Sequence, residues 1–84
     1  MNKLPLAVAL HYDRSVVPVP RVVAKGRGEI GEAILRLAHD HGVPIEENAP
    51  LAEALSQVEL GEDIPEGLYR AVAEVLIFIL RASR

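Results

Sequence analysis

The sequence predicts an α/β fold in which a small mixed β-sheet is packed by about three helices. Two short, mostly apolar runs separated by proline-rich chain are typical of a pair of strands. Three later segments carry apolar residues at helical spacing or the residues that start helices. With 84 residues, 50% of them hydrophobic and 25% charged, the chain suffices for one small core, and we expect a single domain over residues 1–84.

The predicted strands cover residues 6–12 and 21–24. Pro18 and Pro20 lie between them or at the start of the second strand, where they exclude a helix and cannot donate to the ladder of a central strand. Two consecutive strands with a connection of this length favour an antiparallel hairpin with a long loop.

A one-sided helix is predicted to follow Gly26 and to end at Gly42. Glu29 and Glu32 stand near its positive N-terminal end, and glycine is the residue most often found just after a helix C-terminus. The stripe expected to face inward comprises Ile30, Ala33, Ile34, Leu37, Ala38 and His41.

Residues 43–46 are predicted to form a short third strand, because Pro44 prevents the helix from resuming. A strand, a helix of this length and a second strand imply a right-handed parallel crossover from residues 21–25 to residues 43–46. This crossover makes the predicted sheet mixed.

Two more helices complete the predicted fold. Asn48 is suited to cap the first, with Pro50 in its opening turn, and Pro65 starts the second. Their inward residues are predicted to be Leu51, Ala54, Leu55 and Val58 in the first and Leu68, Val72, Val75, Leu76, Ile79 and Leu80 in the second, where Ala73, Ile77 and Phe78 widen the stripe. The last helix is more apolar than one buried face requires, which indicates either deep burial or a patch that binds a partner.

Composition excludes several classes of function. The absence of cysteine rules out disulfides, thiolate metal sites and cysteine nucleophiles. A net charge of −3 leaves no basic excess for nucleic acid, and the apolar runs are far shorter than the ~20 residues of a membrane span. We therefore expect neither nucleic-acid binding nor membrane insertion, and a cytoplasmic location. Basic residues concentrate in residues 1–45 and acidic residues in residues 46–84, which suits protein docking or reflects an ordinary solvated surface.

One motif suggests a nucleotide. Gly26, Gly28 and Gly31 form a G-x-G-x-x-G between a predicted strand and a helix, and Glu46 lies twenty positions beyond Gly26, as in dinucleotide-binding loops. However, a chain this short lacks the two βαβαβ halves that such a cofactor spans. A small nucleotide-binding protein is therefore the alternative function, and glycines that merely turn the chain are the simpler explanation.

No other residues predict an active site, a metal site or a cofactor. His39 and His41 flank Asp40, but two residues apart on a helix they point about 200° apart and cannot share a metal ion. No serine has a neighbouring His–Asp pattern. We expect a protein that is not an enzyme and that uses no cofactor.

Seven stretches, collinear over nearly the whole chain, resemble one family. In order they are residues 7–13 (AVALHYD), 22–26 (VVAKG), 42–45 (GVPI), 50–52 (PLA) with 54–55 (AL), 58–61 (VELG), 64–66 (IPE) with 68–69 (LY), and 71–76 (AVAEVL). By these residues the chain is similar to the C-terminal cytoplasmic domain of the FlhB/YscU-type export switch proteins of flagellar and type III secretion systems. The resemblance implies a small mixed sheet surrounded by helices.

The chain departs from this family in two places. Members that switch substrate specificity carry Asn-Pro-Thr-His before the first strand and cleave themselves between Asn and Pro. This chain has Asn2, Lys3, Leu4 and Pro5 there, a degenerate motif, so we expect no autocleavage. Glu53 stands where the family usually has arginine. The resemblance thus implies a stand-alone homologue of the fragment that cleavage produces, without the family's membrane helices.

The function implied by the resemblance is that of a non-enzymatic module of the export apparatus. Such a module binds export substrates, their chaperones or export-gate components. The resemblance places a shallow apolar recognition patch where the second strand begins and the last helix passes, at Val19, Pro20, Ala73 and Leu76.

The same resemblance predicts a second surface at the first strand. In the family, the segment before the cleavage motif supplies a neighbouring strand, which this chain lacks. The edge of residues 6–12 is therefore expected to bind the membrane-anchored stub of a full-length relative. Alternatively, Lys3, Pro5 and a local helix cover this edge.

Overall fold

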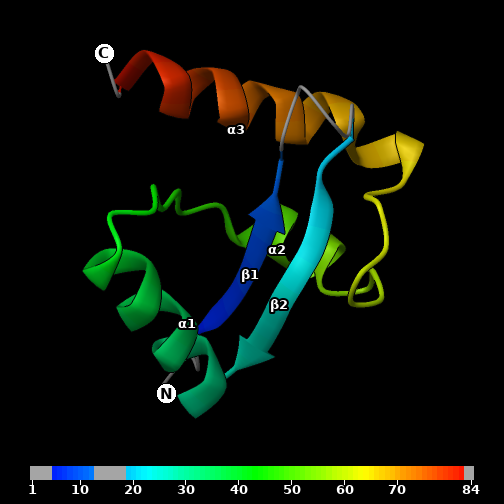
Figure 1. Ribbon diagram of the computed structural model, residues 1–84. Coiled ribbons are helices and arrows are strands. Elements are labelled where there is room, and N and C mark those ends of the chain that lie inside the picture. The colour runs from blue at the N-terminus through cyan, green and yellow to red at the C-terminus, as the bar shows by residue number, and fades with distance from the viewer. Residues whose placement is uncertain (1–4, 13–18, 83–84) are drawn as a thin grey trace.

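The computed structural model describes residues 5–12 and 19–82 and has an α/β architecture (Figure 1). Its elements are, in chain order, β1 (Leu6–His11), β2 (Arg21–Arg27), α1 (Glu29–Asp40), α2 (Ala49–Leu55), a 3₁₀ helix η1 (Glu66–Leu68) and α3 (Tyr69–Ala82). β1 and β2 pair antiparallel. The α/β class, the antiparallel pairing of the two strands and the three predicted helices are thereby confirmed, although β2 continues through Gly26 to Arg27 and is longer than the predicted strand.

The helices lie around the strand pair on different sides (Figure 1). α1 packs near the end where β2 leads into it, and α2 lies behind the strands. α3 crosses the opposite end, where β1 stops and β2 starts. This arrangement brings the last helix of the chain beside the ends of the first two strands.

The hydrophobic core joins β2, α2, α3 and the segment before η1. Its four central side chains, Val22, Leu55, Ile64 and Val72, are at most 4% exposed. Each such burial stabilises the fold by roughly 1.5–3 kcal/mol relative to exposure. Partly buried residues packed against them are Val8, Leu10, Val19, Leu51, Val58, Leu68 and Leu76. The predicted inward faces of the two later helices therefore supply much of the core.

The buried face of α1 is shifted from the predicted stripe, of which Ala33, Ile34 and Ala38 are partly buried. Gly31 is its buried residue, whereas Ile30 and Leu37 of the predicted stripe are 61% and 59% exposed. A Cβ atom at Gly31 would lie 2.4 Å from the carbonyl oxygen of Pro5, so only glycine permits this approach. Because the close contact is made at Gly31, the bulky neighbours on the predicted stripe turn partly toward solvent.

The end of α1 agrees with the prediction from local sequence. Gly42 has a φ of 68°, and its N–H donates to the carbonyl of His39 at 3.2 Å. The N–H of Val43 donates to the carbonyl of Ala38 at 2.8 Å. This pair of hydrogen bonds is a Schellman motif, which terminates the helix.

The predicted third strand and parallel crossover are not confirmed. Residues 43–48 are described and form neither helix nor strand, and Val43 and Ile45 are 54% and 48% exposed. A strand needs a neighbour to satisfy its backbone, and Pro44 has no N–H to offer. The sheet that the described residues form therefore has two antiparallel strands and is not mixed.

Residues 61–64 occupy part of the edge that a crossover strand beside β2 would need. The N–H of Ile64 donates to the carbonyl of Pro20 at 3.0 Å. Val22 exchanges two hydrogen bonds with the same segment, donating to Glu62 at 3.0 Å and accepting from Gly61 at 2.7 Å. The outer edge of β2 is therefore closed at its start by an irregular segment.

Candidate functional site

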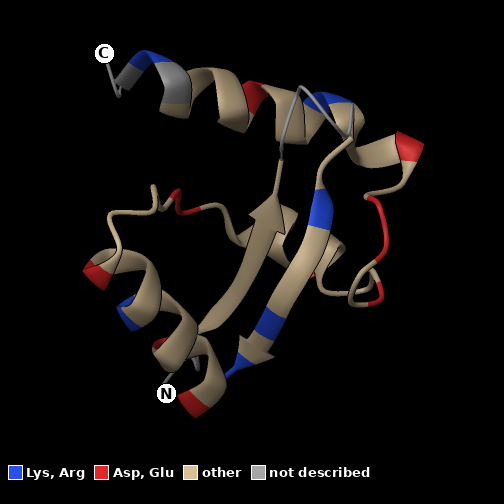
Figure 2. Ribbon diagram, viewed as in Figure 1, with Lys and Arg blue, Asp and Glu red and all other residues tan. Residues whose placement is uncertain are grey.

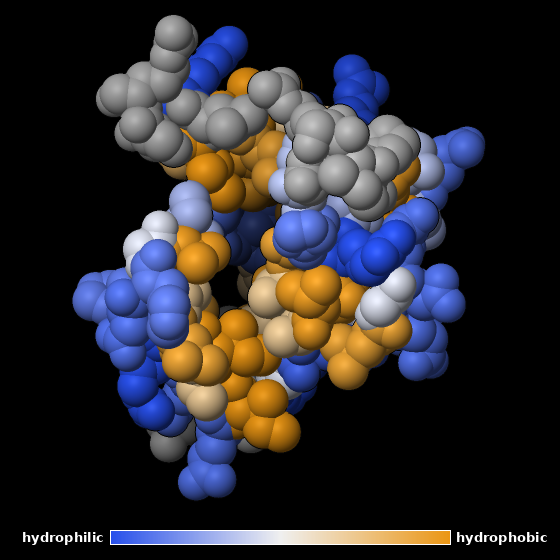
Figure 3. Space-filling model, viewed as in Figure 1, coloured by the Kyte–Doolittle hydropathy of each residue, from blue (hydrophilic) through white to orange (hydrophobic). Residues whose placement is uncertain are grey.

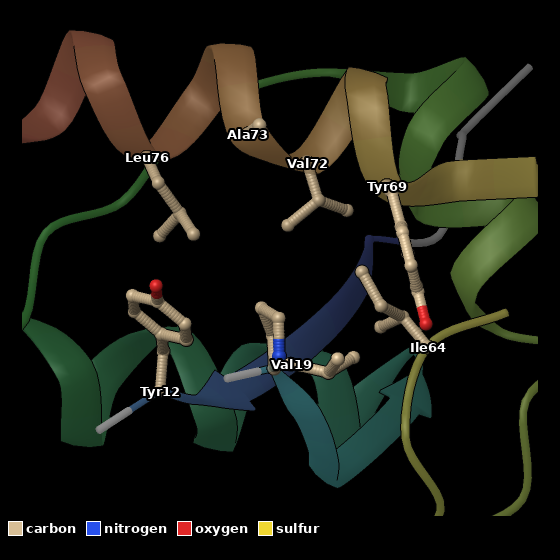
Figure 4. Close-up of a pocket in the computed structure, with 8 residues that line it drawn as sticks. Tyr12, Val19, Ile64, Tyr69, Val72, Ala73 and Leu76 are labelled. Carbon is tan, nitrogen blue, oxygen red and sulfur yellow. The ribbon is translucent and has the colours of Figure 1, made fainter. Parts of the chain in front are cut away.

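An apolar pocket lies between α3 and the end of the strand pair (Figure 4). It has a volume of about 190 Å³. The lining residues are Tyr12, Val19, Pro20, Ile64, Tyr69, Val72, Ala73 and Leu76. None of them carries a charge, so the pocket suits an apolar group.

The sheet side of the pocket depends on Pro20. Its carbonyl accepts the hydrogen bond from Ile64, which holds residues 61–64 against the start of β2. Ile64 is 2% exposed and forms part of the pocket floor. An exposed ion pair beside this contact, Arg21 Nε to Asp63 Oδ1 at 3.3 Å, joins the same two segments.

The helix side of the pocket is one face of α3. Tyr69, Val72, Ala73 and Leu76 follow one another at spacings of three, one and three residues, which places them on the same side of a helix. Val72 is 1% exposed and belongs to the floor, whereas Ala73 is exposed. Because the side chain of Ala73 is only a methyl group, it obstructs little of the pocket on the helix side.

The four predicted patch residues are brought together by the fold. Val19, Pro20, Ala73 and Leu76 all line the pocket, and their role in binding stays a prediction. The sequence reasoning missed the other four lining residues, Tyr12, Ile64, Tyr69 and Val72. Helical spacing from Ala73 and Leu76 points to two of them, Tyr69 and Val72, whereas Tyr12 and Ile64 depend on tertiary contacts.

The two edges of the strand pair differ in their hydrogen bonds. Residues 61–64 pair with the outer edge of β2 at Pro20 and Val22 only. Farther along β2, the Lys25 side chain donates from Nζ to the carbonyls of Ser56 at 2.9 Å and Val58 at 2.7 Å, which are contacts of a side chain and not of the strand edge. Within the described residues, the backbone of β1 has hydrogen bonds to β2 alone. β1 contains no Asp, Glu, Lys or Arg, and the region beside it is hollowed and surrounded by apolar residues (Figure 3). As far as residues 5–12 and 19–82 are concerned, β1 is therefore an open edge without charged side chains.

The degenerate cleavage motif is described only at its last residue. Asn2, Lys3 and Leu4 lie outside the described residues. The carbonyl of Pro5 accepts a hydrogen bond from the N–H of Gly28 at 2.9 Å. Pro5 is thus tied to the start of α1, at one end of β1.

The glycines of the G-x-G-x-x-G motif serve the contact between α1 and the strands. Gly28 has a φ of 70°, and its amide already donates to Pro5. A Cβ atom at Gly26 would lie 2.1 Å from a side-chain carbon of Ile30, and one at Gly31 would meet the Pro5 carbonyl. These contacts account for all three glycines without a nucleotide.

The histidines have local partners. His39 Nδ1 lies 3.8 Å from Asp40 Oδ1, and His41 Nδ1 lies 2.9 Å from the carbonyl oxygen of Leu37. Within residues 5–12 and 19–82, no three His, Cys, Asp or Glu side chains gather as metal ligands.

Two of the three basic residues of β2, Arg21 and Arg27, pair with acidic residues from the second half of the chain. Figure 2 shows the basic positions along β2 and acidic positions in the segment beside its start. Arg27 Nη2 lies 2.9 Å and 3.1 Å from the two carboxylate oxygens of Glu53. Together with the Arg21–Asp63 pair, this contact shows that some basic residues of the first half of the chain form exposed ion pairs with acidic residues of the second half. It also gives Glu53, a departure from the family pattern, a partner in this chain.

The match to known proteins covers nearly the whole chain. A family model described as "FlhB HrpN YscU SpaS Family" matches residues 1–79. The chain belongs to this family. Its members are flagellar and type III export switch proteins, so the resemblance inferred from the seven stretches is confirmed.

Two relatives of the family differ in length. The chain is 43% identical over 75 residues to the uncharacterized protein YlqH of Bacillus subtilis, covering 89% of this chain and 81% of YlqH. It is 44% identical over 84 residues to the flagellar biosynthetic protein FlhB of Salmonella typhimurium. That match covers 99% of this chain and 22% of FlhB, so the chain spans about a fifth of that relative.

Solved structures from the family share the fold. The crystal structure of the PscU C-terminal domain has a TM-score of 0.85 and 32% identity, and the match covers 89% of this chain and 96% of that one. The cytoplasmic domain of FlhB from Shewanella putrefaciens has a TM-score of 0.86 and 36% identity, covering 90% and 60%. Among the described helices of the present chain, none has the length and apolar character needed to cross a bilayer.

Proposed function

We propose that this chain is a non-enzymatic interaction module of the flagellar or type III export apparatus. It acts in the cytoplasm as a single domain over residues 1–84 and binds export substrates, their chaperones or export-gate components. Family membership supports the export role. The observation that carries the binding role is the uncharged pocket lined by Val19, Pro20, Ala73 and Leu76.

The size of the pocket supports recognition of a single apolar side chain. A dry protein cavity of about 150 Å³ holds a benzene molecule, and the present pocket measures about 190 Å³. One aromatic or branched side chain of a partner therefore fills it. The buried floor formed by Ile64 and Val72 supplies dispersion contacts to such a group.

The direct test is Ala73→Glu. The position is exposed on α3, so the fold tolerates the change, while the longer charged side chain obstructs the pocket. We expect purified export substrates, chaperones and gate components that bind the wild-type domain to bind this variant at least tenfold more weakly in isothermal titration. Gln57→Glu, which adds the same charge at an exposed position outside the pocket, is the matched control. Equal binding by wild type and Ala73→Glu contradicts the proposal.

We further propose that the open edge of β1 binds the membrane-anchored stub of a full-length family member that lacks its own C-terminal fragment. The support is that no described residue other than those of β2 pairs with the backbone of β1, and that β1 contains no Asp, Glu, Lys or Arg. An exposed edge of this kind recruits an additional strand.

Proline substitutions in β1 test the stub interaction. Consecutive N–H groups alternate between β2 and the open side, so of Val8→Pro and Ala9→Pro one removes an inward donor and the other an outward donor. The variant that remains folded by circular dichroism is the outward one, and it should lose the stub in a vesicle flotation assay. If wild type does not bind the stub, or the folded proline variant binds equally well, edge pairing is wrong.

A further inference from the structure

We propose that Tyr12 and Tyr69 are the specificity-determining residues of the pocket, and that their hydroxyl groups hydrogen-bond the peptide groups on either side of the inserted apolar side chain. This inference rests on the proposed function, because it assigns the occupant of the same pocket. The occupant is an apolar residue within a polypeptide, recognised through its backbone as well as its side chain.

The distribution of tyrosine in the chain carries the inference. The whole sequence contains two tyrosines, and both line the pocket. The other six lining residues have purely hydrocarbon side chains, so the two phenol oxygens are the side-chain polar atoms of the lining. Among the described residues, the hydrogen-bonding side chains that line the pocket are therefore those of the two tyrosines.

The two tyrosines approach the pocket from opposite walls (Figure 4). Tyr12 follows β1 and extends from the strand pair toward Leu76, whereas Tyr69 begins α3 and descends beside Ile64. Tyr12 is 36% exposed and Tyr69 is 43% exposed. Within the described residues, neither hydroxyl has a hydrogen bond to the rest of the chain. Both hydroxyls are thus accessible to a ligand at the two ends of an apolar floor.

Peptide groups at the mouth of the pocket need such partners. A polypeptide that inserts one side chain brings the two flanking peptide groups to the rim, where they lose water. An unsatisfied peptide group costs more than a hydrogen bond contributes, so a rim without polar groups disfavours a peptide. A phenol hydroxyl both donates and accepts, and its ring adds apolar contact area. The two hydroxyl groups therefore add recognition of peptide groups to a pocket that also accepts a bare hydrocarbon.

Two small probes separate recognition of the backbone from recognition of the apolar group. N-acetyl-phenylalanine N-methylamide carries an aromatic side chain between two peptide groups, and toluene carries the ring alone. Both are titrated into the full chain, and binding is followed through the backbone amide signals of Ala73 and Leu76 in ¹⁵N-labelled protein. Because the chain has two tyrosines and no tryptophan, the tyrosine ring signals of wild type also report directly on the pocket.

The variants are Tyr12→Phe, Tyr69→Phe and the double variant, which keep both rings and remove the hydroxyls. We expect the double variant to bind the amide probe about 3- to 10-fold more weakly, as loss of hydrogen bonds at a partly exposed rim predicts. Toluene should bind wild type and the double variant equally, within twofold. Ala73→Glu should weaken binding of both probes at least fivefold, which places them in the pocket.

Three outcomes overturn the inference. They are an amide probe that does not bind wild type, an amide probe that ignores Ala73→Glu, and a double variant that binds the amide probe as tightly as wild type does. The proposed function is judged separately by the binding of export partners to Ala73→Glu. If that variant loses its partners while the double tyrosine variant keeps the amide probe, the pocket remains the docking site and only the role of the tyrosines fails.

Discussion

Gly31 shows how one residue sets the distance between two elements. Gly31 is the third residue of α1. Within a helix, alanine is normally more stabilising than glycine by ~1 kcal/mol. Here a methyl group would meet the carbonyl oxygens of Pro5 at 2.4 Å and Gly26 at 2.9 Å. Both are backbone atoms, which cannot rotate away as a side chain can. The helix is therefore held against the strands by the absence of a side chain.

We expect Gly31→Ala to destabilise the protein by about 1–3 kcal/mol, because the added methyl group forces α1 away from the strands. Gly67→Ala is the matched control, since a Cβ atom at Gly67 meets nothing within 4 Å. It should leave stability unchanged or raise it by up to about 1 kcal/mol. Urea unfolding followed by circular dichroism measures both changes. If Gly31→Ala is as stable as Gly67→Ala, the close approach described here is wrong.

The second residue-scale prediction concerns Asn2. Because Lys3, Leu4 and Pro5 replace the Pro-Thr-His of family members that cleave themselves, we expect the chain to stay intact. Intact-mass measurement after prolonged incubation at neutral pH should show a single full-length species. A full-length family member that carries Asn-Pro-Thr-His serves as the control for cleavage under the same conditions. Appearance of a fragment that begins at Lys3 refutes this prediction.

Lys25 connects β2 to the segment that follows α2. Its side chain leaves β2 and donates to the carbonyls of Ser56 and Val58, just after the end of α2. The last carbonyls of a helix and of the turn behind it lack partners within the helix. A positive charge there also favours the negative end of the helix. Lys25 therefore joins the strand pair to α2 through a partly buried contact.

We expect Lys25→Met to cost about 1.5–3 kcal/mol of stability, since it removes two charge-assisted hydrogen bonds while keeping the apolar stem. Arg27→Met is the comparison, because Arg27 and Glu53 are 49% and 55% exposed and such a pair contributes ~0.2–1 kcal/mol. The difference should appear in urea titrations at low salt, and 0.5 M NaCl should diminish the Arg27 effect further. A larger loss for Arg27→Met than for Lys25→Met would reverse this ranking.

At the scale of the whole molecule, the described residues form a sheet of two strands with two outer edges. Residues 61–64 pair with the start of the β2 edge. Within residues 5–12 and 19–82, the backbone of β1 has no partner on its other edge. α3 covers the end of the strand pair and leaves the pocket beneath its first half. Tyr12, which directly follows β1, lines the pocket, so the two candidate binding surfaces adjoin each other.

The nucleotide alternative makes a prediction for the whole molecule. Since the glycine motif is occupied by packing contacts, NAD, NADP or ATP at millimolar concentration should change the melting temperature by less than about 1 °C. A ligand at 100 times its dissociation constant would add ~2.7 kcal/mol and raise the melting temperature by roughly ten degrees or more for a chain this short. Differential scanning fluorimetry provides the measurement. A rise of several degrees that disappears in the exposed variant Glu46→Gln would favour nucleotide binding.

The sequence by itself determined the strand pair, the cap of α2, the end of α1 and the family, whereas α2 ends at Leu55, before the predicted helix residue Val58, and α3 begins at Tyr69 and not at Pro65. The Asn48 cap is an example, since its Oδ1 accepts from the N–H of Leu51 at 3.1 Å, three residues away. The stop at Gly42 likewise involves residues within five positions. Such signals can be read from sequence because the groups that interact are neighbours in the chain, and their geometry follows from backbone preferences alone.

The tertiary structure alone decided which face of α1 is buried, whether residues 43–46 pair, and which residues complete the pocket. Ile30 matched the helical period and is nevertheless exposed, because Gly31 contacts Pro5 from another element. Residues 43–46 lacked a strand partner, a fact that no local pattern contains. Ile64 reaches the pocket through its hydrogen bond to Pro20, 44 positions away, and Tyr12 follows β1, whose pairing with β2 brings it beside Val19 and Pro20. Burial and pairing depend on the partner that another part of the chain presents, and that choice is made by packing of the whole fold.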